Sequence, residues 1–259
     1  MPSVLLTESI AVELGGQEPW PEDAKLFQSF EKSQILLPES TASLSVQTYL
    51  RMVGLDHEVE MRPNVESISP SGNAPVLKCG NFVISEMDPI VAFVNTKGIQ
   101  LNPHLTVQQK ADMRAYMSLV NTVLVNAELY ICWEHKETYS EDTQQRYGSV
   151  FPWPLNHFLC FKKRRQVAAR LAVADWRDKS LEDVLEEVQT CCAALSERLG
   201  NQRFFFGEKP TELDALVFGH LYTLMMCSLL DNKLARLVRG FVNLVDLCRR
   251  IEVQYFAET

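Results

Sequence analysis

The sequence lacks the features that mark metal-binding, disulfide-bonded or nucleic-acid-binding proteins. Its seven cysteines include no C-x-x-C pair, and its five histidines show no H-x-x-x-H or Cys/His ligand spacing, so no metal site is predicted. An odd number of cysteines favours buried free thiols in a reducing compartment over a disulfide framework. The formal net charge of −8 argues against a broad nucleic-acid surface, because phosphate binding depends on clustered Lys and Arg.

Targeting and membrane-spanning signals are also scarce. The N-terminus has no charged region followed by an apolar core, and it carries Glu8 and Glu13 with no arginine before Arg51. That composition differs from a secretion signal and from an Arg-rich mitochondrial presequence. The longest nearly apolar run, residues 215–230, is interrupted by polar side chains. Because spanning a bilayer takes about 20 predominantly apolar residues, this run is predicted to be a buried core helix.

The length of the chain and the order of its patterns predict two domains with a shared interface. At 259 residues the chain exceeds the usual size of a single core. Residues 1–20 form a weakly structured extension that ends in a Pro-Trp-Pro segment, which excludes helix. Residues 21–98 follow the order strand, helix, strand, then strand, strand, helix, which predicts a small α/β domain. Residues 99–259 carry helical patterns throughout and predict an all-α bundle.

Periodicity and end signals place the individual elements. Ser180 caps an amphipathic helix that Gly200 closes. Thr211 caps the most apolar helix, with Asp214 expected to accept a hydrogen bond from the Thr211 backbone while favouring the positive helix end. The expected strands are 25–30, 57–61, 76–79 and 82–85, and the expected helices are 43–52, 88–97, 107–133, 180–200 and 211–230.

The stretch around Pro75 resembles the glutathione-binding half of a glutathione-transferase-like thioredoxin fold. A proline precedes a hairpin, and Glu86-Met87 opens the helix after it. In that fold the residue matching Pro75 is cis, and a Glu-Ser or Gln-Ser pair binds the γ-glutamyl group of glutathione. A thioether cannot donate a hydrogen bond to a carboxylate. The resemblance therefore implies a degenerate glutathione site at Pro75, Glu86 and Met87, with no cofactor bound.

A catalytic residue is not predicted either. Enzymes of that superfamily use a Tyr, Ser or Cys just after the first strand to activate the sulfur of glutathione. The corresponding window, residues 28–41, contains no Tyr or Cys. Its hydroxyl groups are typical of turns and helix caps. They belong to Ser29, Ser33, Ser40 and Thr41.

One basic run, Lys162 to Arg165, interrupts this acidic sequence. We interpret it as the solvated face of a helix. Contact with an anionic membrane surface or with an acidic partner is the alternative.

Several unusual segments together resemble the metaxin family, and in particular its second type. The likeness extends over nearly the whole chain and implies a thioredoxin-like N-terminal domain followed by an all-helical domain, as in glutathione transferases. The segments that carry it are Glu18–Pro21, Asn126–Tyr130, Arg146–Ser149, Pro152–His157, Pro210–Tyr222 and Cys248–Glu252.

The metaxin resemblance also implies a function. It implies a non-enzymatic subunit of the sorting and assembly machinery for β-barrel proteins, on the cytosolic face of the mitochondrial outer membrane. The expected partners are a sister metaxin of the first type in a heterodimer and the barrel-shaped core subunit. Membrane association would be peripheral and through these partners, which fits the polar end of the chain at Thr259.

Two other functions stay open from the sequence. One is an adaptor that joins mitochondria to microtubule motors, and the other is a divergent transferase for glutathione conjugates. In the non-enzymatic case, the emptied glutathione cleft is expected to be an apolar groove lined by Met87 that accepts a peptide segment.

Overall fold

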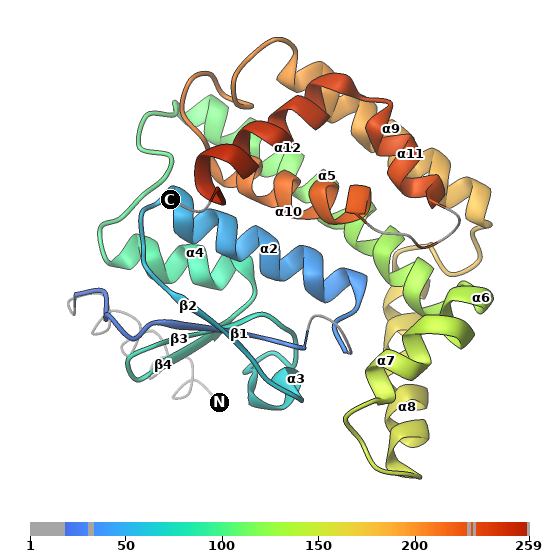
Figure 1. Cartoon of the computed structure of the whole chain (residues 1–259). Helices are drawn as coiled ribbons and strands as arrows, with labels where there is room; N and C mark the ends of the chain where they lie inside the picture. Colours follow the sequence, from blue (N-terminus) through green and yellow to red (C-terminus); the bar gives the residue numbers. More distant parts are fainter. Residues whose placement is uncertain (1–18, 31–33, 227–228, 230–231, 258–259) are drawn as a thin grey trace.

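The computed structural model describes residues 19–30, 34–226, 229 and 232–257, so the expected extension lies almost wholly outside the described residues. A small mixed sheet with helices on it is joined to a larger helical body (Figure 1). The described strands are β1 (Lys25–Gln28), β2 (Glu58–Met61), β3 (Val76–Cys79) and β4 (Phe82–Ser85). The described helices are α2 (Leu37–Met52), α3 (Val65–Ile68), α4 (Met87–Thr96), α5 (Val107–Trp133), α6 (Lys136–Thr138), the π-helical turn η1 (Tyr139–Thr143), α7 (Gln144–Gly148), α8 (Leu155–Val173), α9 (Leu181–Leu199), α10 (Glu212–Met226), α11 (Lys233–Arg239) and α12 (Val242–Tyr255).

The sheet has the strand order β2-β1-β3-β4, with β1 parallel to β2 and the other neighbours antiparallel. A parallel pair needs a long connection, and α2 provides it. Leu26 in β1 lies opposite Val59 in β2 and Leu77 in β3, and both leucines are fully buried. Helices α2 and α4 lie on one face of the sheet (Figure 1). The predicted order of strands and helices in this half is confirmed.

The first helix begins earlier than predicted, at Leu37 rather than at residue 43. Pro38 occupies its first turn, where the missing N–H would have no helical partner in any case. The strand before it is shorter than predicted and ends at Gln28, because the Phe30 carbonyl instead accepts from the amides of Gln34 (3.0 Å) and Ile35 (2.9 Å) in a turn. The added turns of α2 bring its polar residues to the side of the sheet.

Helices α5 and α9 have the predicted bounds, and side chains cap the backbone amides of their first turns. Thr106 and Gln109 form a capping box at the start of α5, and Ser180 and Asp183 form one at the start of α9. Among the described residues, α5 is long and apolar enough to cross a bilayer, but 61% of its apolar window is buried inside the protein. Burial of that extent is typical of the core helix of a bundle.

Helices α2 and α10 approach each other more closely than ordinary side chains allow. A Cβ atom placed on Gly219 would lie 2.1 Å from Ser45 Oγ and 2.5 Å from the Ser45 backbone nitrogen. Ser45 Oγ donates to the carbonyls of Thr41 (2.8 Å) and Leu216 (3.3 Å). Helix α2 is thus packed between the sheet and the helical body, as Figure 1 shows. The predicted domain boundary near residue 98 falls in the connection between α4 and α5 and stays a prediction.

The start of α10 is held by Thr211 and Asp214, both fully buried. Asp214 Oδ2 accepts from the Thr211 amide and hydroxyl, each at 2.7 Å, and Oδ1 accepts from the Phe205 amide at 3.0 Å. The Thr211 hydroxyl therefore donates to the carboxylate. Burial raises the pKa of Asp214 to about 6, although these hydrogen bonds oppose the shift. Because the Phe205 amide is also bound, the cap fixes the loop before the helix.

The six cysteines among the described residues are all buried. Burial raises the pKa of the Cys192 thiol to about 12, with a similar effect on Cys191, so neither is a reactive thiolate near neutral pH. Cys227 and the predicted end of the apolar helix at Leu230 lie outside the described residues.

Candidate functional site

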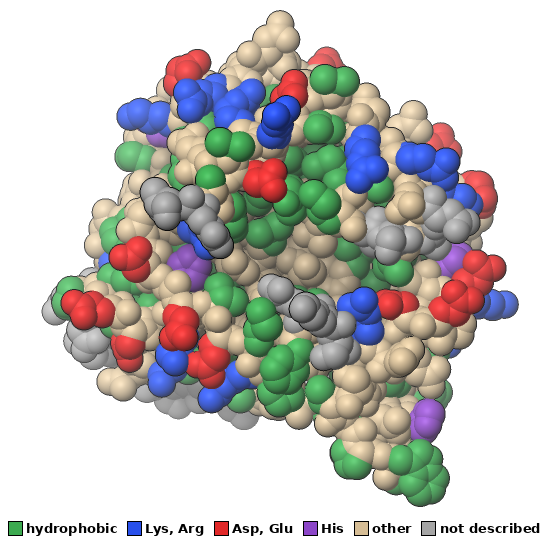
Figure 2. Space-filling view, in the orientation of Figure 1, with side chains coloured by type: hydrophobic (Ala, Val, Ile, Leu, Met, Phe, Trp, Pro, Cys, Tyr) green, Lys and Arg blue, Asp and Glu red, His purple; other side chains and the backbone are tan. Residues whose placement is uncertain are grey.

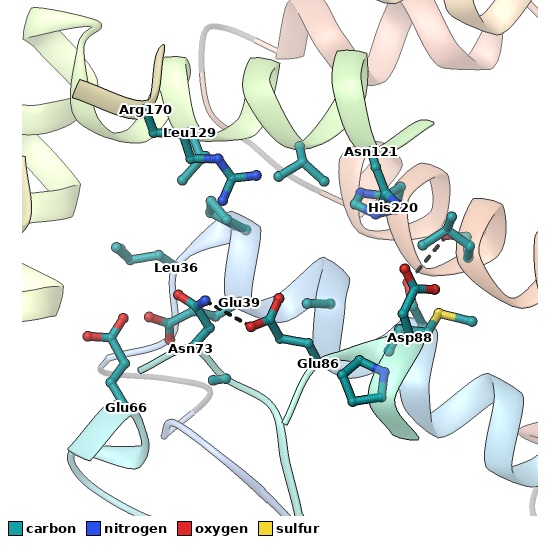
Figure 3. A pocket seen from close by; sticks show the side chains of 18 of the residues that line it. Leu36, Glu39, Glu66, Asn73, Glu86, Asp88, Asn121, Leu129, Arg170 and His220 are labelled. Atoms are coloured by element: carbon teal, nitrogen blue, oxygen red, sulfur yellow. Dashed lines mark hydrogen bonds between the residues drawn. The ribbon is translucent and has the colours of Figure 1, made fainter. Parts of the chain in front are cut away.

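A cavity of about 370 Å³ lies between the sheet half and the helical body. We call this cavity the cleft. One wall is formed by the start of α2, by α3, by the chain before β3 and by the start of α4; α5, α8 and α10 form the other (Figure 3). Its lining residues are Leu36, Pro38, Glu39, Ala42, Ser45, Glu66, Asn73, Ala74, Glu86, Met87, Asp88, Pro89, Met117, Asn121, Val125, Leu129, Trp133, Lys163, Arg170, Leu216 and His220.

The structure brings the three residues of the predicted degenerate site together at the cleft. Glu86 and Met87 line it, and buried Pro75 lies next to the lining residue Ala74. The Ala74–Pro75 peptide bond is cis. The Glu86 amide donates to the Pro75 carbonyl at 3.3 Å. Asn73 Nδ2 donates to Glu86 Oε1 at 3.1 Å, which directs this carboxylate along the edge of the cleft (Figure 3).

The backbone of Glu86 is strained. Its φ of 68° with ψ of 156° lies in a region that residues other than glycine rarely adopt. Such a conformation costs about 1–3 kcal/mol and is concentrated at binding and catalytic sites. The fold therefore holds Glu86 in place at a cost, although the side chain after it is a methionine.

The hydroxyl groups of the predicted window do not offer a nucleophile to the cleft. Thr41 is fully buried and donates to Glu128 Oε2 at 2.8 Å. Buried Ser29 is hydrogen-bonded to the Glu39 carboxyl, and Ser40 lies in the first turn of α2. Ser33 lies outside the described residues. Each described hydroxyl of the window therefore has a structural place.

The cleft is more charged than the predicted apolar groove. Met87, Met117 and Leu129 supply apolar surface, but four carboxylates also line it. Lys163 and Arg170 from α8 stand on the other wall, and Figure 3 shows Arg170 across from the acidic side chains. The prediction named the apolar lining but not these charges, which come from segments far apart in the sequence. The acidic lining residues are Glu39, Glu66, Glu86 and Asp88.

The basic run is only partly a solvated face. Lys163 Nζ donates to Glu66 Oε1 of α3 in a close ion pair, and Tyr147 donates to Glu66 Oε2 at 3.2 Å. The Arg164 guanidinium lies 4.2 Å from the ring centroid of Tyr139, a cation–π distance. The two middle residues of the run therefore fasten α8 to the rest of the protein.

A second cavity, also of about 370 Å³, lies on the other side of Glu39. Three of its lining residues carry a buried oxygen that has no hydrogen-bond partner, namely Gln34 Oε1, Glu39 Oε2 and Asn64 Oδ1. Buried polar atoms are nearly always paired in native structures. Acceptors gathered in this way fit a ligand rich in N–H donors, such as an ammonium or guanidinium group.

Glu39 is the most perturbed carboxyl group in the cleft. Burial and the neighbouring Glu66 carboxylate raise its pKa to about 7, while Lys163 and the hydrogen bond from Ser29 act in the opposite direction. The folded protein consequently holds a proton on Glu39 at pH values where the unfolded chain has lost it. Ionisation of Glu39 therefore destabilises the fold as the pH rises from about 4.5 towards 7 and beyond.

Glu39→Gln is expected to make the protein less sensitive to rising pH. The amide cannot ionise, so the variant should gain stability over the parent protein at pH values above about 7 and little near pH 5. Urea midpoints measured across this range test the difference. Glu208→Gln, an exposed site outside the cleft, is the control and should follow the parent profile. If the stability of Glu39→Gln and that of the parent protein change with pH in the same way, the raised pKa of Glu39 is contradicted.

A buried polar network, which the sequence patterns did not reveal, lies behind the cleft. His220 of α10 and Glu128 of α5 are hydrogen-bonded from Nδ1 to Oε1 at 2.6 Å, and both side chains are almost fully buried. Thr41 of α2 donates to the other oxygen of Glu128. Glu128 thus ties three helices together. The available signal was a glutamate inside the otherwise apolar face of the helix predicted over 107–133.

The fold is that of glutathione transferases. A glutathione transferase of Bombyx mori superimposes with a TM-score of 0.56 at 12% identity, covering 91% of this chain and 90% of that one. A glutathione transferase family member from Pseudomonas fluorescens, crystallised with two glutathione molecules, gives 0.55 at 15% identity and covers 94% of both chains. A model of the glutathione S-transferase C-terminal domain matches residues 188–251. The chain is therefore a protein of the glutathione-transferase-like fold class.

Sequence relatives narrow this class further. Metaxin-2 of Homo sapiens is 48% identical over 254 residues, covering 98% of this chain and 97% of the human protein. The Metaxin-2 homolog of Caenorhabditis elegans is 42% identical over 83% of this chain and 93% of its own length. Metaxin-1 of Mus musculus is 35% identical over 83% of this chain and 69% of its own length. The chain belongs to the metaxin family.

A second family model connects this membership to a cellular role. It is described as an outer mitochondrial membrane transport complex protein, and it matches residues 43–164. This segment includes most of α2, the cis-proline hairpin and α5. Together with the metaxin relatives, the match supports assignment of the chain to a transport complex of the mitochondrial outer membrane.

Proposed function

We propose that the protein is a non-enzymatic subunit of the sorting and assembly machinery that inserts β-barrel proteins into the mitochondrial outer membrane. It acts on the cytosolic face, as a heterodimer with a metaxin of the first type and bound to the barrel-shaped core subunit. Membership of the metaxin family and the match to the transport-complex model support this role.

One observation carries the non-enzymatic part of the proposal. Met87 stands at the position where the glutathione-transferase-like fold presents a hydroxyl group to the ligand carboxylate, and a thioether cannot replace that donor. The backbone around it, including the strained Glu86, still has the geometry of a binding site. We infer that the site keeps the backbone shape of a binding site and lacks its recognition chemistry.

The charge of the cleft is a second argument against binding of glutathione. Glutathione carries two carboxylates and a net negative charge at neutral pH. Asp88 adds a carboxylate to the wall of the cleft that carries Glu86. Like charges at short range raise the free energy of binding. A peptide segment with a basic side chain is the better complement, and a precursor or partner segment could supply it.

Depletion of the protein from mitochondria is expected to slow assembly of imported β-barrel precursors several-fold, with presequence-carrying precursors imported at the usual rate. Native electrophoresis of radiolabelled precursors over time measures this difference, and re-expression of the chain should restore it. Capture of a tagged chain under mild detergent should recover the type-one metaxin.

Two outcomes would contradict the proposal. Unchanged barrel assembly after complete depletion would remove the role in the machinery. Retention of the purified protein on immobilised glutathione, with turnover of a generic electrophile, would instead support the divergent transferase.

A further inference from the structure

The outer face of α8 is unusually apolar for an exposed helix. Leu155, Phe158 and Phe161 are 44%, 63% and 58% exposed, and Trp153, just before the helix, is 79% exposed. The outward side of a helix on a soluble protein normally carries polar residues. Contiguous apolar patches on a protein surface mark sites of association.

The exposed apolar and basic side chains share one broad face of the helix. Residues 155, 158, 162 and 165 follow the spacing i, i+3, i+7 and i+10, and Phe161 follows Phe158 by three residues, which keeps them on one side of an α-helix. The opposite side carries Cys160, Val167 and Leu171, which are buried against the protein. The exposed face is therefore distinct from the face that packs inward.

This face lies on a protruding part of the molecule. Helices α7 and α8 extend away from the helical body as an arm, and the connection between them is at its tip (Figure 1). Hydrophobic side chains gather at this tip in the space-filling view (Figure 2). The bulk of the protein lies away from the tip and leaves it free to meet a flat surface.

The charge on α8 is opposite to that of the whole protein. The helix contains five Lys or Arg residues and no Asp or Glu, whereas the chain has a net charge of −8. Lys163 and Arg164 make internal contacts, but Lys162 and Arg165 are exposed beside the phenylalanines. Arg165 lies 5.9 Å from the ring centroid of Phe161. Apolar and cationic groups thus occupy the same exposed surface.

We propose that the outer face of α8 near the tip of the arm, together with Trp153, binds the surface of an anionic lipid bilayer. Aromatic side chains favour the headgroup level of membranes, and exposed Lys and Arg are attracted to anionic lipids. An acidic protein partner would also complement the two cations, and the experiments below separate that outcome from membrane binding. This contact goes beyond the proposed function, in which partners alone hold the protein at the membrane.

Vesicle flotation with the purified full-length protein tests the proposal. The protein should float with vesicles of phosphatidylcholine mixed with phosphatidylglycerol, and far less with phosphatidylcholine alone. Lys162→Glu/Arg165→Glu should weaken binding by about tenfold or more. Added salt should weaken parent binding, because the Debye length falls from about 10 Å at 0.1 M to about 3 Å at 1 M.

The apolar contribution is tested with matched variants. Trp153→Ser/Phe158→Ser/Phe161→Ser should lose flotation while keeping the parent Tm, since all three side chains are exposed. Val242→Ser/Val253→Ser removes two exposed valines of α12 and should float like the parent protein. Equal losses in both variants would overturn the assignment to α8.

Tryptophan fluorescence gives a second readout. Trp133 and Trp176 are buried, and the half-buried Trp20 lies outside α8 and donates to the Asp56 carbonyl. A blue shift on adding anionic vesicles should therefore come mainly from Trp153 and should largely disappear in Trp153→Phe. Absence of both flotation and blue shift in the parent protein would overturn the proposal. Flotation that is independent of lipid charge would overturn it as well. The proposal would also be overturned if the parent protein does not float and the triple variant no longer binds the type-one metaxin. The face would then be a protein interface.

Discussion

Replacement of Gly219 by alanine is expected to lower the Tm of the protein by about 6–12 °C, equivalent to roughly 3 kcal/mol for a chain of this size. The added methyl carbon would lie 2.1 Å from Ser45 Oγ and 2.5 Å from the Ser45 nitrogen. A backbone nitrogen cannot move aside as a flexible side chain can, so α2 and α10 must separate. Differential scanning calorimetry measures the loss.

A second glycine provides the matched control. Gly148 is also helical, but a Cβ there would meet its nearest neighbours, Asn156 Cβ and Cys160 Sγ, at 3.5 Å, an ordinary van der Waals distance. Gly148→Ala should therefore leave the Tm unchanged or raise it slightly, because alanine favours helix by about 1 kcal/mol over glycine. Ser45→Ala should not rescue Gly219→Ala, because the backbone contact remains. An unchanged Tm for Gly219→Ala would show that the two helices are farther apart than described.

Glu128→Ala is expected to destabilise the protein by about 3–5 kcal/mol, the usual effect of removing one partner of a buried polar pair. His220, which is 2% exposed, would lose its hydrogen-bond partner at 2.6 Å. Thr41 is affected less, because its hydroxyl also donates to the Pro38 carbonyl at 3.0 Å. Urea unfolding, followed by far-ultraviolet circular dichroism, measures the change.

The double variant Glu128→Leu/His220→Phe tests whether the loss of stability comes from leaving one polar group of the pair without its partner. Apolar side chains of similar size leave no unpaired group at either position, so this variant should be more stable than Glu128→Ala. Glu186→Ala, on the exposed side of α9, controls for loss of a helical glutamate and should change stability by less than about 0.5 kcal/mol. A Glu128→Ala variant as stable as this control would exclude a structural role for the pair.

Local signals in the sequence were sufficient for much of the fold. Helix α9 has the predicted bounds because Ser180 and Asp183 satisfy its first amides and Gly200 ends it. Helix α5 was predicted to the residue, since it has no internal glycine or proline and carries a long apolar periodicity. The cis-proline hairpin was inferred from its resemblance to a known fold. In each case the information lies within a short stretch of chain.

Contacts between distant segments could not be predicted in this way. Glu128 and His220 are separated by 92 positions, and Lys163 and Glu66 by 97. No local pattern connects these pairs, so the polar interior behind the cleft and its acidic lining were both missed. The outer face of α8 was missed for another reason. Its apolar residues and the basic run Lys162 to Arg165 come together on one surface only when the whole of α8 is formed.

The tight seating of α10 on α2 has a consequence for the newly made protein. Ser45 and the Leu216 carbonyl that accepts its hydrogen bond are 171 positions apart. During translation, α2 leaves the ribosome long before α10 exists, so one flank of the first helix must stay uncovered for most of synthesis. Exposed apolar surface of this kind invites aggregation. Chains interrupted before residue 212 should accordingly be recognised by general chaperones and degraded, and should not accumulate as stable sheet domains.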